Sequence, residues 1–205
     1  MEWGAQTCHQ ELAGAYTGEI SPQMIADMGG RWVIIGHSER RQYFGETDSL
    51  ITEKIDAALA AGLRPVLCVG EPEEVRQMGG QDDFVQGQMS AGLKNIANMA
   101  LSDQKSALGQ LVIAYEPVWA IGSGEVASLD DIAAMHQAIA SESSKSQNGH
   151  KAPLPILYGG SVNADNAKGI FAIDHVDGAL VGGASLDAAA FDSICESAVL
   201  QMSKS

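Results

Sequence analysis

A carboxylate at the end of an apolar strand is the residue of this sequence best placed for acid–base chemistry. Glu116 follows the apolar run 111–115, and Pro117 fixes the backbone directly behind it. A loop of small residues comes next and leads into an amphipathic stretch. This order holds one acid on a rigid element beside a loop that can move over it, as a general base under a lid requires. A surface acid that caps a loop is the alternative, and the buried type of the preceding strand disfavours it.

A histidine follows a second strand in the same way. His37 comes after the apolar run 32–35 and Gly36, at the predicted N-terminus of a short helix. The dipole of such a helix lowers the pKa of an imidazole and favours the neutral ring. A neutral imidazole can donate a hydrogen bond to a carbonyl oxygen and polarise it. A structural or solvated histidine is the alternative, and the candidate base at Glu116 favours the catalytic interpretation.

Two glycine-rich turns offer a site for an anion. Gly159-Gly160-Ser161 and Gly182-Gly183 each follow an apolar run and precede a helical stretch. Backbone N–H groups at such turns bind phosphate, and glycine lets a ligand approach the chain closely. Either turn alone could be a simple tight turn. Their position on the last two strands predicts a phosphate site.

The elements that must position these residues alternate between strands and helices. Short apolar runs predict buried parallel strands at residues 4–7, 32–35, 65–69, 111–115, 155–158 and 178–181. Amphipathic stretches predict helices at residues 48–61, 82–99, 130–144, 164–171 and 188–202. We expect helix N-caps at Asp48, Asp130 and Asp187, and a helix C-terminal cap at Gly62.

Six β-then-α units indicate an α/β protein with a parallel sheet, either doubly wound or curled into a barrel. Polar or glycine-rich residues follow almost every predicted strand. In a parallel barrel these strand ends converge on one mouth, where such enzymes place their chemistry. The pattern therefore favours the barrel.

Composition and charge narrow the classes of function. The 205 residues carry a net charge of −14, which argues against nucleic acid and anionic membranes as partners. No apolar run reaches the ~18 residues of a membrane span, and the N-terminus has no signal-peptide pattern, so we expect a cytoplasmic protein. The widely spaced cysteines and histidines fit neither a disulfide framework nor a metal site. An anionic small molecule remains possible if local backbone amides hold it.

Together these segments resemble the triosephosphate isomerase family, bacterial type, over nearly the whole chain. The matching segments are Gly4-Ala5-Gln6, 14–21, 34–41, 67–71, 114–124, 158–162 and 177–186. The resemblance implies interconversion of dihydroxyacetone phosphate and glyceraldehyde 3-phosphate, with no cofactor and no metal. It implies that Glu116 moves a proton between adjacent carbons, that His37 is the electrophile on the oxygens, and that Glu39 is the acid behind them.

The resemblance also implies a lid, a phosphate site and a subunit interface. Pro117, Val118 and Trp119 match the first hinge of the lid, and its tip matches Ala120, Ile121, Gly122, Ser123 and Gly124. The phosphate site corresponds to the backbone amides of Gly122, Ser161, Gly182 and Gly183. Thr17 and Glu19 lie in the loop that family dimers insert beside the neighbour's active site, and Arg40 matches the intramolecular partner of Glu19.

The chain departs from the family pattern at its N-terminus. The family barrel has eight βα units in ~250 residues, and Gly4-Ala5-Gln6 matches its third strand. We therefore expect one truncated domain over residues 1–205, an α/β fold that forms an incomplete TIM-type (β/α) barrel of about six βα units, strands 3–8 of the family barrel. The family's Asn-x-Lys element, whose lysine neutralises phosphate and enolate charge, has no match here. The expected activity is therefore very weak or lost.

Six strands cannot close the usual barrel, so we expect open edges at the first and last strand. Neighbouring copies would cover this gap in an obligate homo-oligomer, a dimer or higher. Two main hypotheses of function remain: a weak isomerase, or a non-catalytic oligomeric barrel remnant that binds phosphate or a sugar phosphate. A product that merely folds is the third.

Overall fold

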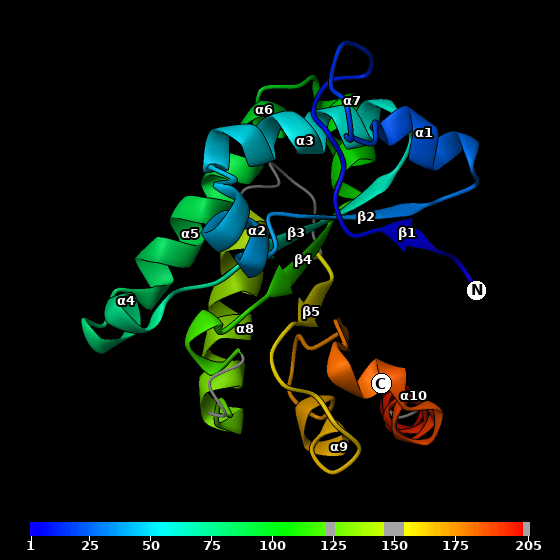
Figure 1. The fold of residues 1–205 in the computed structure, drawn as a ribbon. Coiled ribbons are helices and arrows are strands. Elements are labelled where there is room, and N and C mark those ends of the chain that lie inside the picture. The colour runs from blue at the N-terminus through cyan, green and yellow to red at the C-terminus, as the bar shows by residue number, and fades with distance from the viewer. Residues whose placement is uncertain (122–125, 146–153, 203–205) are drawn as a thin grey trace.

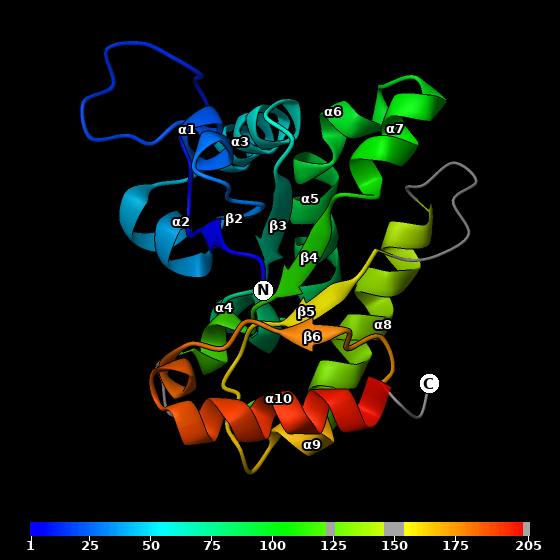
Figure 2. The same ribbon diagram turned by 90° about the vertical axis from the view of Figure 1, so that its right-hand side faces the viewer.

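The computed structural model describes residues 1–121, 126–145 and 154–202. Its core is a six-stranded parallel sheet in which each strand pairs with its neighbours in sequence, in the order β1-β2-β3-β4-β5-β6. The strands are β1 Gly4–Ala5, β2 Trp32–Ile35, β3 Arg64–Val69, β4 Val112–Tyr115, β5 Ile156–Tyr158 and β6 Gly178–Ala179. The sheet curls and carries its helices on the outer side (Figures 1 and 2), which confirms the expected incomplete barrel of six βα units.

Helices fill the connections between the strands. They are α1 Pro22–Asp27, α2 Ser38–Phe44, α3 Asp48–Ala60, α4 Glu73–Gln77, α5 Gln81–Gly92, α6 Lys94–Ala97, α7 Leu101–Leu108, α8 Leu129–Lys145, α9 Ala167–Ile170 and α10 Ala188–Met202. Two short 3₁₀ helices, η1 Val118–Ala120 and η2 Gly183–Leu186, follow β4 and β6. Both therefore lie at the carboxyl ends of strands.

Alternating side chains of the strands pack into two separate hydrophobic clusters. Residues such as Ile35, Leu67 and Ile113 point outward and join the large cluster beneath the helices. The residues between them point to the concave side, where Val66 and Val112 are buried with two small neighbours. On the outer strands the same concave face carries only partly buried apolar side chains, Trp32, Ile34, Leu157 and Leu180. The interior of the curled sheet is therefore covered at its centre and open toward its edges.

The two end strands are shorter than the sequence predicts. The predicted strands 4–7 and 178–181 reduce to Gly4–Ala5 and Gly178–Ala179. Each of these strands has a partner on one side only among the described residues, so half of the usual ladder hydrogen bonds are absent there. The four inner strands match the prediction to within one residue at each end.

Several helix predictions need correction. The stretch 82–99 is not one helix, because α5 and α6 are separated at Leu93, and α1, α4 and α7 were not predicted. Thr47 rather than Asp48 caps α3, accepting a hydrogen bond from the N–H of Leu50 at 3.3 Å. Ser128 rather than Asp130 caps α8 through the N–H of Asp131 at 3.1 Å.

Two predicted caps are confirmed. Asp187 accepts a hydrogen bond from the N–H of Ala190 at 2.8 Å, at the start of α10. Gly62 follows α3 with φ of +74°, a conformation that glycine adopts without strain. In the part of the chain that the structure describes, no helix has both the length and the apolar character to cross a membrane.

Candidate active site

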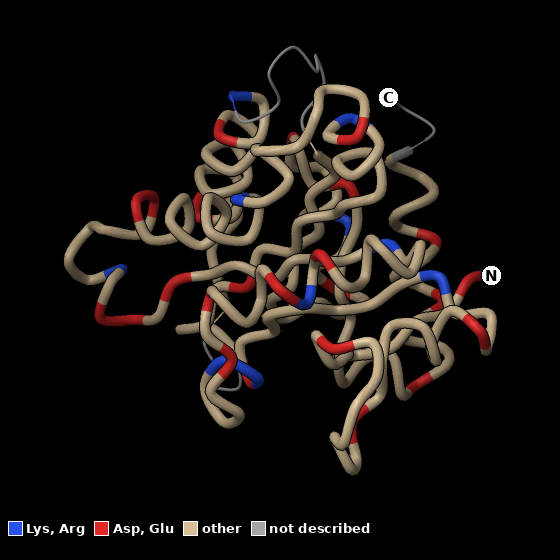
Figure 3. The backbone as a smooth tube through the Cα atoms, turned by 90° about the horizontal axis from the view of Figure 1, so that it is seen from above, with Lys and Arg blue, Asp and Glu red and all other residues tan. Residues whose placement is uncertain are grey.

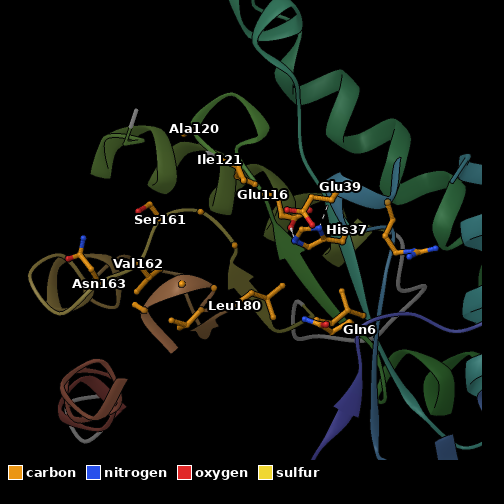
Figure 4. Close-up of a pocket in the computed structure, with 18 of the residues that line it drawn as sticks. Gln6, His37, Glu39, Glu116, Ala120, Ile121, Ser161, Val162, Asn163 and Leu180 are labelled. Carbon is orange, nitrogen blue, oxygen red and sulfur yellow. Dashed lines mark hydrogen bonds and ion pairs between the residues drawn. The ribbon is translucent and has the colours of Figure 1, made fainter. Parts of the chain in front are cut away.

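The carboxylate of Glu116 lies against the imidazole of His37 at the carboxyl ends of β4 and β2. Its Oε1 is 2.9 Å from Nε2 of His37, and its Oε2 accepts a hydrogen bond from the N–H of Ser38 at 2.9 Å. The Glu116 side chain is only 2% exposed, whereas that of His37 is 31% exposed. Figure 4 shows the two side chains pointing toward each other in one cavity. The two predicted acid–base residues therefore occupy a single site.

Glycines on the neighbouring strands make room for Glu116. The N–H of Glu116 donates to the carbonyl of Val69 at 2.8 Å, so the residue continues the β3–β4 ladder. A Cβ at Gly70 would lie 1.7 Å from the carbonyl oxygen of Glu116, and one at Gly159 would lie 2.9 Å from its Cγ. The predicted phosphate turn thus has a second role at Gly159. The role of Gly70 was missed, because only the pairing of β3 with β4 reveals it.

The position of His37 fixes which ring nitrogen faces the cavity. His37 is the N-cap of α2, and its Nδ1 accepts a hydrogen bond from the N–H of Glu39 at 3.3 Å. The neutral ring must then carry its proton on Nε2, the nitrogen that faces Glu116. This tautomer is the one that can donate a hydrogen bond into the cavity.

The expectation that the pKa of His37 is lowered is wrong for this structure. The contact with the Glu116 carboxylate raises the pKa of His37, although partial burial of the ring opposes that change. A full negative charge at 2.9 Å outweighs the partial charge of a helix end. The charge of Glu39 acts in the same direction. Glu39 itself is exposed in the first turn of α2 and lines the same cavity.

One cavity of about 840 Å³ joins this pair to the predicted phosphate-binding residues. Ser161, Gly182 and Gly183 line it together with His37 and Glu116. A Cβ at Gly182 or Gly183 would meet nothing within 4 Å, so the backbone there borders open space. Ser161 lies across the cavity from the carboxylate–imidazole pair (Figure 4). The structure therefore brings both predicted groups to one mouth.

The surroundings of this cavity offer little positive charge. Acidic residues outnumber Lys and Arg by 26 to 12, and Figure 3 shows them distributed around the whole fold. Arg40 is the only Lys or Arg among the described residues that line the cavity. An anionic ligand would have to be held there by backbone N–H groups.

The first half of the predicted lid is hydrogen-bonded to a buried glutamate. Glu71 is fully buried, and its Oε1 accepts hydrogen bonds from the indole of Trp119 at 2.9 Å and the hydroxyl of Tyr115 at 3.1 Å. The guanidinium of Arg76 bonds to the same oxygen at 3.1 Å and stacks over the Trp119 ring at 4.5 Å. Sequence reasoning gave Glu71 no role. Its signal was similar to that of Glu116, an acid shortly after the predicted end of a strand, here two residues beyond it with Gly70 between.

The remaining lid residues are only partly described. Pro117 precedes η1, which contains Val118, Trp119 and the buried Ala120, and Ala120 and Ile121 line the cavity. The predicted tip residues Gly122, Ser123 and Gly124 lie outside the described residues.

The predicted interface residues lie on a loop that projects from the fold. Thr17 and Glu19 are exposed in the segment 9–20, which extends away from the other elements in Figure 2. The predicted pairing of Glu19 with Arg40 is wrong for the described residues, because the guanidinium of Arg40 pairs with Glu46. Glu46 is buried beside Lys54, whose Nζ lies 2.6 Å from the carboxylate. Burial opposes ionisation, but the two cations lower the pKa of Glu46 and hold it as a carboxylate.

The described part of the folded chain shows no candidate metal site. No group of three or more His, Cys, Asp or Glu side chains gathers there in a way that could hold a metal ion. The prediction that no cofactor is needed stays a prediction.

A sequentially ordered parallel sheet, curled with helices outside and polar groups at its carboxyl ends, defines the TIM-barrel class of α/β proteins. The comparisons with known proteins narrow this class. The family model described as triosephosphate isomerase matches residues 1–198. The chain therefore belongs to the triosephosphate isomerase family.

Individual relatives agree with this assignment. The chain is 50% identical to the triosephosphate isomerase of Herpetosiphon aurantiacus over 189 residues, which cover 92% of this chain and 73% of the relative. It is 45% identical to that of Thermus thermophilus over 190 residues, 92% of this chain and 73% of the relative. The crystal structure of triosephosphate isomerase from Bartonella henselae superposes with a TM-score of 0.84 at 37% identity, covering 96% of this chain and 77% of that one.

Proposed function

We propose that this chain interconverts dihydroxyacetone phosphate and D-glyceraldehyde 3-phosphate by proton transfer through an enediolate. The observation that carries the proposal is the single cavity in which Glu116, His37 and the glycine turns 159–161 and 182–183 meet. The family membership of the chain supports the same reaction. Substrate would enter between the two side chains, whose facing atoms are 2.9 Å apart without it.

In this mechanism Glu116 is the base and His37 the electrophile. The carboxylate takes a proton from the carbon beside the substrate carbonyl, and the electron pair of the broken C–H bond moves toward the carbonyl oxygen. The N–H on Nε2 of His37 donates a hydrogen bond to that oxygen and stabilises the enediolate. A proton then moves between the two enediolate oxygens, and Glu116 returns its proton to the neighbouring carbon.

We expect slow turnover by the 205-residue chain. Arg40 is the one Lys or Arg that lines the described part of the cavity, and Glu46 already neutralises it. The described cavity wall therefore has no free cation to stabilise negative charge in the transition state. The loss of one such group typically raises the activation free energy by ~3 kcal/mol, which slows the reaction ~100-fold. A coupled assay of the purified chain tests this, with Glu116→Gln as control. Activity that survives the substitution is host contamination and contradicts the proposal.

A second candidate is a non-catalytic protein that binds phosphate or a sugar phosphate. The absence of an uncommitted cation from the described cavity wall favours it. Stabilisation of the chain by inorganic phosphate in a thermal shift assay, with no turnover in the coupled assay, would select this candidate.

We also propose that the chain self-associates. The projecting segment 9–20 and the end of α2 expose large apolar side chains: Leu12, Tyr16, Ile20, Tyr43 and Phe44. Exposed apolar side chains of this size are typical of a surface that a partner covers. Light scattering of the purified chain should give a dimer or a larger species, and a monodisperse monomer contradicts this proposal.

A further inference from the structure

The buried histidine of α8 connects three elements that surround the cavity. His136 has no exposed surface and lies in the middle of α8. Its ring packs edge-on against Tyr115 with 5.9 Å between centroids, and tilted against Tyr158 at 6.3 Å. Tyr115 directly precedes Glu116, and Tyr158 directly precedes the phosphate turn at Gly159. One ring thus contacts the ends of both β4 and β5 from behind the site.

The third contact of His136 is to the turn that leads into β6. Nδ1 lies 2.8 Å from the carbonyl oxygen of His175. A carbonyl oxygen only accepts hydrogen bonds, so Nδ1 must carry the proton in this contact. Nε2 is buried and has no hydrogen-bond partner among the described residues. Only the neutral ring with its proton on Nδ1 satisfies this environment, and burial lowers the pKa of His136 accordingly.

The turn that His136 contacts is held by few other interactions. His175 has φ of +65° and is the one non-glycine residue of the described chain in the left-handed region. Asp177 exchanges two hydrogen bonds with Ile156, one through its side chain at 2.8 Å and one through its N–H at 2.9 Å. β6 itself contains two residues and is paired only with β5 in the described structure. Gly182 and Gly183 follow it by a few residues.

We propose that His136 is a positioning residue, whose buried Nδ1–H holds the His175 turn and so places β6 and the glycines at 182–183 beside β5. This inference rests on the proposed function, in which Gly182 and Gly183 bind phosphate. The titratable groups that face the ring are His175 and Asp177 on the turn, Tyr115 on β4 and Tyr158 on β5.

A pair of similar-sized substitutions tests the proposal. In His136→Asn the side-chain amide can replace the Nδ1 donor, whereas His136→Leu has no donor. We expect His136→Leu to weaken binding of inorganic phosphate on the order of tenfold. Amide hydrogen exchange of residues 176–181 should rise while that of β2 and β3 stays protected. His136→Asn should restore both properties.

Equal exchange and equal phosphate affinity in His136→Leu and the wild type would overturn the proposal. The proposal would also be overturned if His136→Leu lowered protection from hydrogen exchange evenly over all six strands and His136→Asn did not restore that protection. If His136→Leu fails to fold, the ¹⁵N spectrum of the wild-type histidine decides, because the proposal requires the proton on Nδ1 and a proton on Nε2 contradicts it. If wild-type chain binds no phosphate, the proposed function fails, while hydrogen exchange still decides the role of His136.

Discussion

Replacing Gly159 by alanine tests how tightly the site holds its base. The added Cβ would lie 2.9 Å from Cγ of Glu116 and 3.2 Å from the carbonyl oxygen of Tyr115, whereas ordinary contacts begin near 3.4 Å. Because Glu116 is 2% exposed, its side chain has little room to move without breaking the contact with His37. Overpacking of this kind costs ~1–3 kcal/mol of unfolding free energy. A displaced base typically costs ~100-fold in turnover.

The pKa of His37 reports this displacement without needing turnover. The Glu116 carboxylate raises that pKa, so Gly159→Ala should move it back toward the ordinary histidine value in an NMR titration. A raised folded-state pKa stabilises the chain below the unfolded value of ~6.5, and this stabilisation is lost as pH rises through the folded value. Gly159→Ala should therefore weaken the pH dependence of the free energy of unfolding between the unfolded-state and folded-state pKa values of His37.

Gly87 provides a matched control for this experiment. It is exposed in α5, and an added Cβ there would meet nothing within 4 Å. Gly87→Ala should leave the pKa of His37 unchanged and stabilise the helix by ~0.5–1 kcal/mol. If Gly159→Ala keeps the wild-type pKa of His37 and the wild-type stability, the reasoning about the crowded base is refuted.

Two further substitutions test the buried charges. Lys54→Met leaves the buried Glu46 carboxylate with one fewer cation and should lower the free energy of unfolding in urea by ~3 kcal/mol. The control Lys145→Met breaks an exposed pair on α8 and should change that free energy by less than ~0.5 kcal/mol. Similar losses in the two variants would contradict the assigned pairing of Lys54 with Glu46. Glu71→Gln removes the charge that accepts the hydrogen bond of the Trp119 indole at the start of the lid. Hydrogen exchange of that indole N–H, followed by NMR, should become faster. An unchanged exchange rate would contradict the role of Glu71 in holding Trp119.

The sequence predicts the parts of this fold that depend on local pattern. The inner strands were predicted to within one residue, because both of their faces are buried and they read as continuous apolar runs. The break between α5 and α6 at Leu93 was missed, because Leu93 continues the apolar periodicity and the single glycine before it, Gly92, was not read as a helix end.

The site was predictable to the extent that its residues follow strands. Glu116 and the two glycine turns come directly after apolar runs and His37 comes one residue after one, and the curled parallel sheet brings such ends together. Gly70 and His136 were not predicted to matter, because their roles depend on which strands and helices are neighbours. The raised pKa of His37 was missed for the same reason, since it depends on a carboxylate 79 positions away in the sequence.

Proton exchange at the substrate carbon tests the central claim most directly, because Glu116 is proposed to remove and return that proton. Purified chain incubated with dihydroxyacetone phosphate in D₂O should incorporate deuterium at the carbon that bears the hydroxyl group, as followed by ¹H NMR. Glu116→Gln should abolish this incorporation, while binding of inorganic phosphate at Gly182 and Gly183 persists. Incorporation at the same rate in wild type and Glu116→Gln, or none in either, would contradict the role of Glu116 as the base.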